Sequence, residues 1–255
     1  MKLTRFAAAL AVIVAATGGC RATPAASAPD VTVLCSNAFK TVFETLTPQF
    51  ERATRHQIAV RYGLAARLKE QIDAGQPFDL AILTSATIDD LIRAGKLAPD
   101  SRTVLARSGL GLIVKAGARK PDLSSVEAFT RQLLAAKSIA YAKEGASGIA
   151  FAAISQRLGV ADQLAAKTTL TASGEAVGEA VVRGDVEFGV LPVSEILPVR
   201  GAELAGTFPA GAQSYVVMVA AVPAAAKDPG PAKELIKFLT ATAALPVITA
   251  KGMER

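Results

Sequence analysis

Short apolar segments alternate with helical patterns through most of the chain, and this alternation constrains the fold more than any other feature. Between the segments, apolar residues recur at the spacing of a helix face packed on a core, as Leu64, Leu68 and Ile72 do. Strands joined by helices run parallel, and a parallel sheet is buried on both faces. The sequence therefore predicts an α/β fold. The strand-like segments are VTVLC (31–35), QIAVRY (57–62), FDLAIL (78–83), SIAYA (138–142) and VEFGVL (186–191).

The alternation is interrupted by apolar runs without helices. In the middle of the chain, TVLARS (103–108) and GLGLIVKAG (109–117) are two strand-like runs with a glycine-marked break between them, and AQSYVVMVAAV (212–222) is a long apolar run. The 255 residues, 51% of them hydrophobic, suffice for two modest domains. We expect two lobes joined by two crossings, with a cleft where strand ends and helix starts meet. The expected boundaries are residues 30–108 with 217–255 for lobe 1, and 109–216 for lobe 2.

Residues 1–28 have the pattern of a signal peptide and linker. A basic start with Lys2 and Arg5 precedes an apolar run (6–16) that is too short to span a membrane. Cleavage is expected either before Cys20, in the lipoprotein-like sequence TGGC, or at a small-residue site within 22–28. The first alternative gives the protein a lipid anchor at Cys20. Both alternatives place the mature protein in the periplasm.

Removal of this leader lowers the net charge. The full chain carries 28 basic and 22 acidic residues, a net charge of +6, and the leader contains three of the basic residues, which leaves 25 against 22. We therefore predict no nucleic-acid partner. The mature chain keeps Cys35 as its one unmodified cysteine and has no internal disulfide. Cys35 is either a buried small residue or part of the cleft lining.

Most familiar catalytic and cofactor-binding signatures are missing. A single histidine argues against histidine-dependent triads and histidine-rich metal sites. No glycine-rich segment has the spacing and the lysine of a phosphate-binding loop. We accordingly expect no metal and no cofactor, and we assign no catalytic residue.

Four predicted helix starts point into the expected cleft. Three of them have a candidate cap: Ser36 or Asn37 for the first helix, Ser147 immediately before the third, and Ser173 for the fourth. Uncapped or serine-capped helix starts can instead bind an oxyanion through backbone N–H groups without a metal. Both interpretations stay open on the residues alone, and Arg67 is either a solvent-facing side chain or an anion ligand. The four starts are CSNAF (35–39), YGLAAR (62–67), KEGASGIAF (143–151) and TASGEAV (171–177).

Several of these motifs occur in an order that resembles a known family. VTVLCSNAF, FDLAIL, the Ser-Gly helix start at 147–148, VEFGVL and the ending KGMER together resemble the periplasmic molybdate-binding protein family, from about residue 31 to residue 255. The resemblance implies a two-lobed type II periplasmic binding protein fold, each lobe a mainly parallel sheet flanked by helices, with a two-strand hinge. It also implies an oxyanion held by backbone N–H and hydroxyl groups, and delivery of that ligand to an ABC permease.

Hydroxyl groups that the molybdate binders carry are absent from the matched positions. Ala38 replaces a serine after the first strand, Leu64 and Ala65 replace a serine pair, and Pro192 replaces a tyrosine. A hydrogen bond to a charged group contributes about 1.5 to 3 kcal/mol, so molybdate is not the expected ligand. An arginine fork pairs with a carboxylate through two hydrogen bonds. Arg67 therefore favours an organic acid.

The segment VEFGVLPVSEILPV is also similar to aconitate isomerase, an enzyme with the same fold. A proton shift beside a carboxylate needs a base and charge stabilisation. Candidates in the cleft are Lys143, Glu144, Glu175 and Glu195. The alternative function is a cofactor-free isomerase acting on an unsaturated tricarboxylate.

The leading prediction is a monomeric, exported binding protein. It captures a small anion, an organic carboxylate or a molybdate-like oxyanion, between its lobes for an ABC transporter. It contacts the membrane only through the possible lipid anchor at Cys20. The expected ligand-binding residues are Ser36, Asn37, Ala38, Ala65, Arg67, Ser147 and Gly148.

Overall fold

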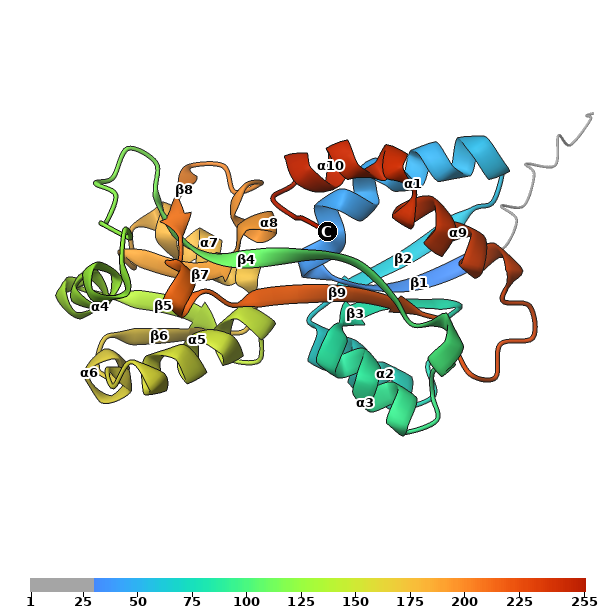
Figure 1. The fold of residues 1–255 in the computed structure, drawn as a ribbon, viewed down its shortest axis with the longest axis horizontal. Helices are drawn as coiled ribbons and strands as arrows, with labels where there is room; N and C mark the ends of the chain where they lie inside the picture. Colours follow the sequence, from blue (N-terminus) through green and yellow to red (C-terminus); the bar gives the residue numbers. More distant parts are fainter. Residues whose placement is uncertain (1–29) are drawn as a thin grey trace, which may run out of the picture.

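A computed structural model describes residues 30–255, so the expected leader and the possible lipid anchor at Cys20 lie outside the described residues. In this part of the chain, nine strands form one mixed sheet in the order β2-β1-β3-β9-β4-β7-β5-β6, with β8 paired to β4. Helices cover both faces of the sheet and the elements gather in two groups along the long axis of the molecule (Figure 1). The predicted α/β class is confirmed.

The first group, called the first half below, contains the three N-terminal strands. In it β1 lies parallel between β2 and β3. Helices α2 and α3 cover one face, and α1, α9 and α10 cover the other (Figure 1). The elements are β1 (Val31–Ser36), α1 (Lys40–Thr54), β2 (Ile58–Gly63), α2 (Ala65–Asp73), β3 (Leu80–Thr84), α3 (Ser85–Arg93), α9 (Gly230–Thr240) and α10 (Leu245–Ala250).

The second half contains the strands and helices from the middle of the chain. Its strand β5 lies parallel between β6 and β7, and β8 pairs with β4. The elements are α4 (Val126–Ala135), β5 (Ile139–Ala142), α5 (Ala146–Arg157), α6 (Ala161–Ala165), β6 (Thr168–Thr171), α7 (Gly174–Arg183), β7 (Phe188–Pro192), α8 (Val193–Ile196) and β8 (Ala202–Thr207).

Two long strands, β4 (Thr103–Lys115) and β9 (Tyr215–Ala221), join the halves (Figure 1). β4 pairs with β9 as far as Gly109 and with β7 from Leu110 onward, so it passes from one half into the other. The sequence predicted a break in this segment, and the structure corrects that prediction: the strand is continuous. Gly109, which marks the predicted break, pairs with Tyr215 of β9, and the next residue, Leu110, pairs with Pro192 of β7, so the ladder continues across the glycine.

The start of α5 also differs from the prediction. Gly145 donates its N–H to the carbonyl of Ala142 at 3.1 Å, and this tight turn starts the helix at Ala146. Ser147 is therefore the second residue of α5 and not its cap. Ser173 does cap α7, because its hydroxyl accepts a hydrogen bond from the N–H of Ala176 at 3.2 Å.

The core of the first half is built on the apolar face of α1. Phe43 and Phe50 of this helix and Phe39 just before it are fully buried, as is Cys35 near the end of β1. Of the two interpretations of Cys35, the buried one is confirmed, and burial raises the pKa of its thiol. No helix within residues 30–255 has the length and apolar character that crossing a membrane requires.

Candidate ligand-binding site

Three helix starts face one another between the two halves. The residues that precede α2, α3 and α5 are Leu64, Thr84 and Gly145, and each has extended backbone and no side-chain capping bond. Ser36, which precedes the short 3-10 turn at 37–39, likewise makes no capping bond. The first N–H groups of a helix have no partner inside the helix. These starts therefore offer N–H donors and positive dipole ends to a ligand.

A small cavity lies among these helix starts. Its volume is about 20 Å³, which is room for about one water molecule. Both halves contribute to its wall, and so does the joining strand β9 through Val216. The lining residues are Ser36, Asn37, Ala38, Leu64, Ala65, Thr84, Ala142, Gly145, Ala146, Ser147, Gly174, Pro192, Glu195 and Val216.

Five of the seven predicted binding residues line this cavity: Ser36, Asn37, Ala38, Ala65 and Ser147. Ser36 and Ser147 are nearly buried, with 6% and 4% of their surface exposed. Within residues 30–255, neither hydroxyl group nor the amide of Asn37 makes a side-chain hydrogen bond to another residue. These polar groups are thus oriented along a cavity wall without a protein partner.

Gly148, the sixth predicted residue, supports the cavity without lining it. It is buried in the first turn of α5, where a Cβ would overlap the carbonyl oxygen of Ala142. Only glycine lets α5 approach the end of β5 this closely. Gly148 therefore fixes where the N–H groups of this helix start lie.

Arg67, the seventh, lies outside the cavity. Its guanidinium contacts Glu70 of its own helix at 3.0 Å and Glu144 of the second half at 2.9 Å. The hydrogen bond to Glu70 and the charge of Glu144 raise its pKa. Arg67 is exposed, and in this structure it joins the halves at the rim of the cleft.

Glu195 brings a carboxyl group into the same wall. The Glu195 side chain forms no ion pair and no hydrogen bond within the described residues. Its Oε2 lies against Gly174 at the start of α7. Burial, followed by the negative charge of Glu175, raises the pKa of Glu195 to about 7. The start of α7 favours the ionised form by about 0.3 to 1 kcal/mol. Desolvating an unpaired carboxylate costs several kcal/mol, so the neutral form gains overall.

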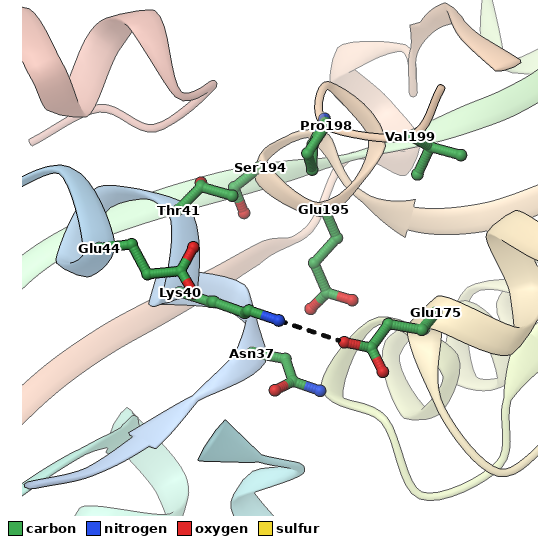
Figure 2. Close-up of a pocket in the computed structure, with 10 residues that line it drawn as sticks. Asn37, Lys40, Thr41, Glu44, Glu175, Ser194, Glu195, Pro198 and Val199 are labelled. Atoms are coloured by element: carbon green, nitrogen blue, oxygen red, sulfur yellow. Dashed lines mark ion pairs between the residues drawn. The ribbon is translucent and has the colours of Figure 1, made fainter. Parts of the chain in front are cut away.

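A larger cavity of about 330 Å³ adjoins the small one and shares Asn37, Gly174 and Glu195 with it. Figure 2 shows Lys40, Glu175 and Glu195 converging on this space from α1, α7 and α8. Lys40 Nζ lies 3.7 Å from Glu175, which makes a second ion pair between the halves. We call this space the side cavity.

Sequence reasoning missed Thr84 as a site residue and considered Glu195 only as a possible base. Thr84 carries the same signal as the other positions, since it ends a buried strand and directly precedes a helix. Glu195 had no such signal, because it lies in the short helix α8, whose position depends on distant contacts. One of these is the hydrogen bond from the hydroxyl of Ser194 to the carbonyl of Ala38 at 2.9 Å.

The described residues contain no group of three or more histidine, cysteine, aspartate or glutamate side chains arranged to hold a metal ion. The donors along the cavity wall are instead backbone N–H groups, the hydroxyl groups of Ser36, Thr84 and Ser147, and the amide of Asn37. This set is suited to binding oxygen atoms of a small anion.

Two characterised proteins are similar to the chain over most of its length. An aconitate isomerase from Pseudomonas sp is 28% identical over 234 residues, which cover 88% of this chain and 87% of the relative. The molybdate-binding protein ModA of Azotobacter vinelandii is 26% identical over 233 residues, which cover 89% of this chain and 91% of the relative. The predicted resemblance to the molybdate-binding proteins is confirmed.

Solved structures establish the fold. The periplasmic molybdate-binding protein of Azotobacter vinelandii matches with a TM-score of 0.74 at 21% identity, covering 89% of this chain and 99% of that one. The sulfate-binding protein SubI from Mycobacterium tuberculosis H37Rv matches with a TM-score of 0.72 at 16% identity, covering 88% and 85%. The model of the family described as "Bacterial extracellular solute-binding protein" matches residues 31–254. The chain therefore belongs to the bacterial extracellular solute-binding protein family and has the α/β periplasmic binding protein fold of the molybdate-binding proteins.

Proposed function

We propose that this protein captures a small carboxylate-bearing anion in the cavity between its two halves. The observation that carries the proposal is the convergence of three helix starts without side-chain caps on one cavity that also holds two unpaired serine hydroxyls. Ser36, Asn37, Ser147 and the backbone at Ala38 and Ala65 are the proposed contacts. Anion binding at helix starts is favoured by N–H donation and by the helix dipole together.

The halves act in this proposal as two lobes that move about β4 and β9. The change of partner in β4 between Gly109 and Leu110 supports the expected lobe boundary at 108/109. The cavity of about 20 Å³ holds about one water molecule in this form. The lobes therefore separate to admit the anion and then close around it less tightly than in this structure. The Arg67–Glu144 and Lys40–Glu175 pairs are contacts that the closed form makes and an open form loses.

The sparse hydroxyl groups favour a carboxylate over a tetrahedral metal oxyanion. Ser36, Thr84 and Ser147 are the hydroxyl-bearing residues of the wall, whereas Ala38, Leu64 and Pro192 supply none. The relatives are named for molybdate, sulfate and aconitate, so the superfamily accommodates both ligand classes. In this proposal Arg67 acts in lobe closure. The protein acts as a monomer in the periplasm and delivers the captured ligand to an ABC permease.

An aspartate placed at a helix start tests this proposal. Ala65→Asp puts a carboxylate at the first residue of α2, where it suits the dipole and preserves the helix but occupies the anion position. Ala161→Asp is the matched control, because Ala161 is the first residue of α6 and lies outside this cavity. Thermal unfolding is followed with molybdate, sulfate, citrate and aconitate.

A ligand at a hundred times its Kd stabilises the folded state by about 2.7 kcal/mol. For a domain of this size that raises Tm by roughly 5 to 10 °C. At least one organic anion should produce this shift in the wild type and in Ala161→Asp, and none in Ala65→Asp. A shift that survives in Ala65→Asp contradicts the proposed site, and a shift only with molybdate contradicts the proposed ligand class.

A second function, isomerisation of an unsaturated carboxylic acid, is favoured by Glu195. A carboxyl group whose pKa is about 7 and which faces an anion cavity can both accept and return a proton near neutral pH. In the proposed step Glu195 removes a proton from a carbon beside a ligand carboxylate, the double bond shifts, and the same proton returns to the far end of the system. No oxidant is needed. Glu195 must be ionised in the complex for this step, so the function is an alternative to a Glu195 that is neutral when the ligand is bound. Conversion of one aconitate isomer into the other, followed by NMR and lost in Glu195→Gln, supports this function, and binding without conversion contradicts it.

A further inference from the structure

We propose that Glu195 takes up one proton when an anion enters the cavity, and that the resulting neutral carboxyl group selects ligands by donating a hydrogen bond to them. This inference rests on the proposed function, because it concerns the same cavity. It adds a specificity residue that the family resemblance does not assign.

The position of Glu195 is the first argument. Its carboxyl group lies in the wall shared by the anion cavity and the side cavity, together with Asn37 and Gly174. A Cβ on Gly174 would overlap Oε2 of Glu195, so this oxygen lies directly against the first residue of α7. The carboxyl group of Glu195 thus stands between the start of α7 and any ligand at the other three helix starts.

The charges around Glu195 are the second argument. Lys40 and Glu44 from α1 and Glu175 from α7 are the other charged residues that line the side cavity. Lys40 is paired with Glu175, and no cation pairs with Glu195 among residues 30–255. The strands that complete the wall of the small cavity contribute uncharged residues, with Glu195 as its one charged member.

An incoming anion therefore meets a carboxylate that has no counter-ion. A second negative charge within a few ångströms favours the neutral form of Glu195, as Glu175 and burial already do. Binding and protonation must then strengthen each other, because coupling between two sites is reciprocal. A neutral carboxyl group has an O–H donor that a carboxylate lacks, so the protonated side chain can bind a ligand oxygen.

Calorimetry on the mature chain measures the proton directly. Sulfate, molybdate and aconitate are titrated in at pH 8 in two buffers of different ionisation enthalpy, because these anions are fully ionised there and release no proton of their own. We expect uptake of close to one proton per bound anion at pH 8 and little uptake at pH 6. The affinity should weaken about tenfold per pH unit above the pKa of Glu195.

Glu195→Gln is the test variant, since its amide keeps a hydrogen-bond donor and cannot titrate. It should bind without proton uptake and with a flat pH profile. Glu44→Gln is the matched control, because it removes a carboxylate from the side cavity on the opposite wall and should keep the proton uptake. As a measurement on the wild type alone, the carbon-13 resonance of one glutamate carboxyl group should titrate near pH 7 and shift to higher pH when the anion is added.

The outcomes separate the two proposals. Binding without proton uptake by the wild type, or unchanged uptake in Glu195→Gln, overturns the role of Glu195 and leaves the proposed function intact. Failure of every probe anion to bind overturns the proposed function, and the inference with it.

Discussion

Gly148→Ala should damage both stability and binding because of a single methyl group. The new Cβ would overlap the carbonyl oxygen of Ala142 and come within 2.9 Å of the ring of Tyr141, whereas real Cβ atoms stay beyond 3.0 Å. The obstacle is backbone, so α5 and β5 must move apart. That movement also strains the 3.1 Å hydrogen bond from the N–H of Gly145 to the carbonyl of Ala142.

The magnitude follows from these two effects. Overpacking a close-packed site costs about 1 to 3 kcal/mol. Losing one backbone hydrogen bond adds about 0.5 to 1.5 kcal/mol. We therefore expect the free energy of unfolding of Gly148→Ala to fall by roughly 2 to 4 kcal/mol, measured from urea unfolding followed by circular dichroism.

Gly63→Ala is the control, because a Cβ at Gly63 would meet the side chain of Leu68 at 3.4 Å, an ordinary contact. Its free energy of unfolding should lie within about 1 kcal/mol of the wild type. The anion-induced thermal shift should be lost in Gly148→Ala and kept in Gly63→Ala. A Gly148→Ala variant as stable as Gly63→Ala would refute the close approach of α5 to β5.

Three further predictions concern contacts around the cleft. The pKa of Glu195 is about 7 in the folded protein, against an ordinary 4.5. The free energy of unfolding of the wild type should therefore fall relative to that of Glu195→Gln as pH rises from 4.5 to 7, and the difference between the two proteins should stay constant above pH 7. Urea unfolding at several pH values measures this. Ser194→Ala should lower the free energy of unfolding by about 1 to 3 kcal/mol, since the buried carbonyl of Ala38 loses its donor. Arg67→Ala should leave the unfolding curve unchanged, because the ion pairs of Arg67 are exposed. Losing the closing contact with Glu144 should weaken the affinity for the best anion by at most about fivefold, measured by calorimetry. A tenfold loss of affinity would make Arg67 a ligand.

The local features of the fold could be predicted from the sequence. Strands such as β3 are short apolar runs, and α2 repeats its apolar residues at helical spacing, so both signals are contained in neighbouring residues. The same holds for the cavity residues Ser36, Ala65 and Ser147, each of which lies at a strand end or a helix start. Parallel pairing of β1 with β2 brings Ser36 and Ala65 to one edge of the sheet in the first half. Ser147 follows β5, which runs in the opposite direction, so the strand ends of the two halves face each other.

The contacts between distant segments could not be predicted in this way. Arg67 is the third residue of α2, and whether its side chain points into the cleft or to the rim depends on Glu144, which comes from the other half. Glu195 belongs to α8, whose place against the first half depends on the buried hydrogen bond between Ser194 and Ala38. Periodicity carries no information about such pairs. The break predicted at Gly109 was wrong for the same reason, because the pairing that carries β4 across it, with β9 and then with β7, is a tertiary contact.

A crystal structure with the tightest-binding of the probe anions tests the central claim most directly. The account predicts density for the anion among the starts of α2, α3 and α5, with oxygen atoms about 2.7 to 3.2 Å from backbone N–H groups near Ala65 and Ser147. Density only in the side cavity beside Lys40, with the helix starts unoccupied, would contradict it.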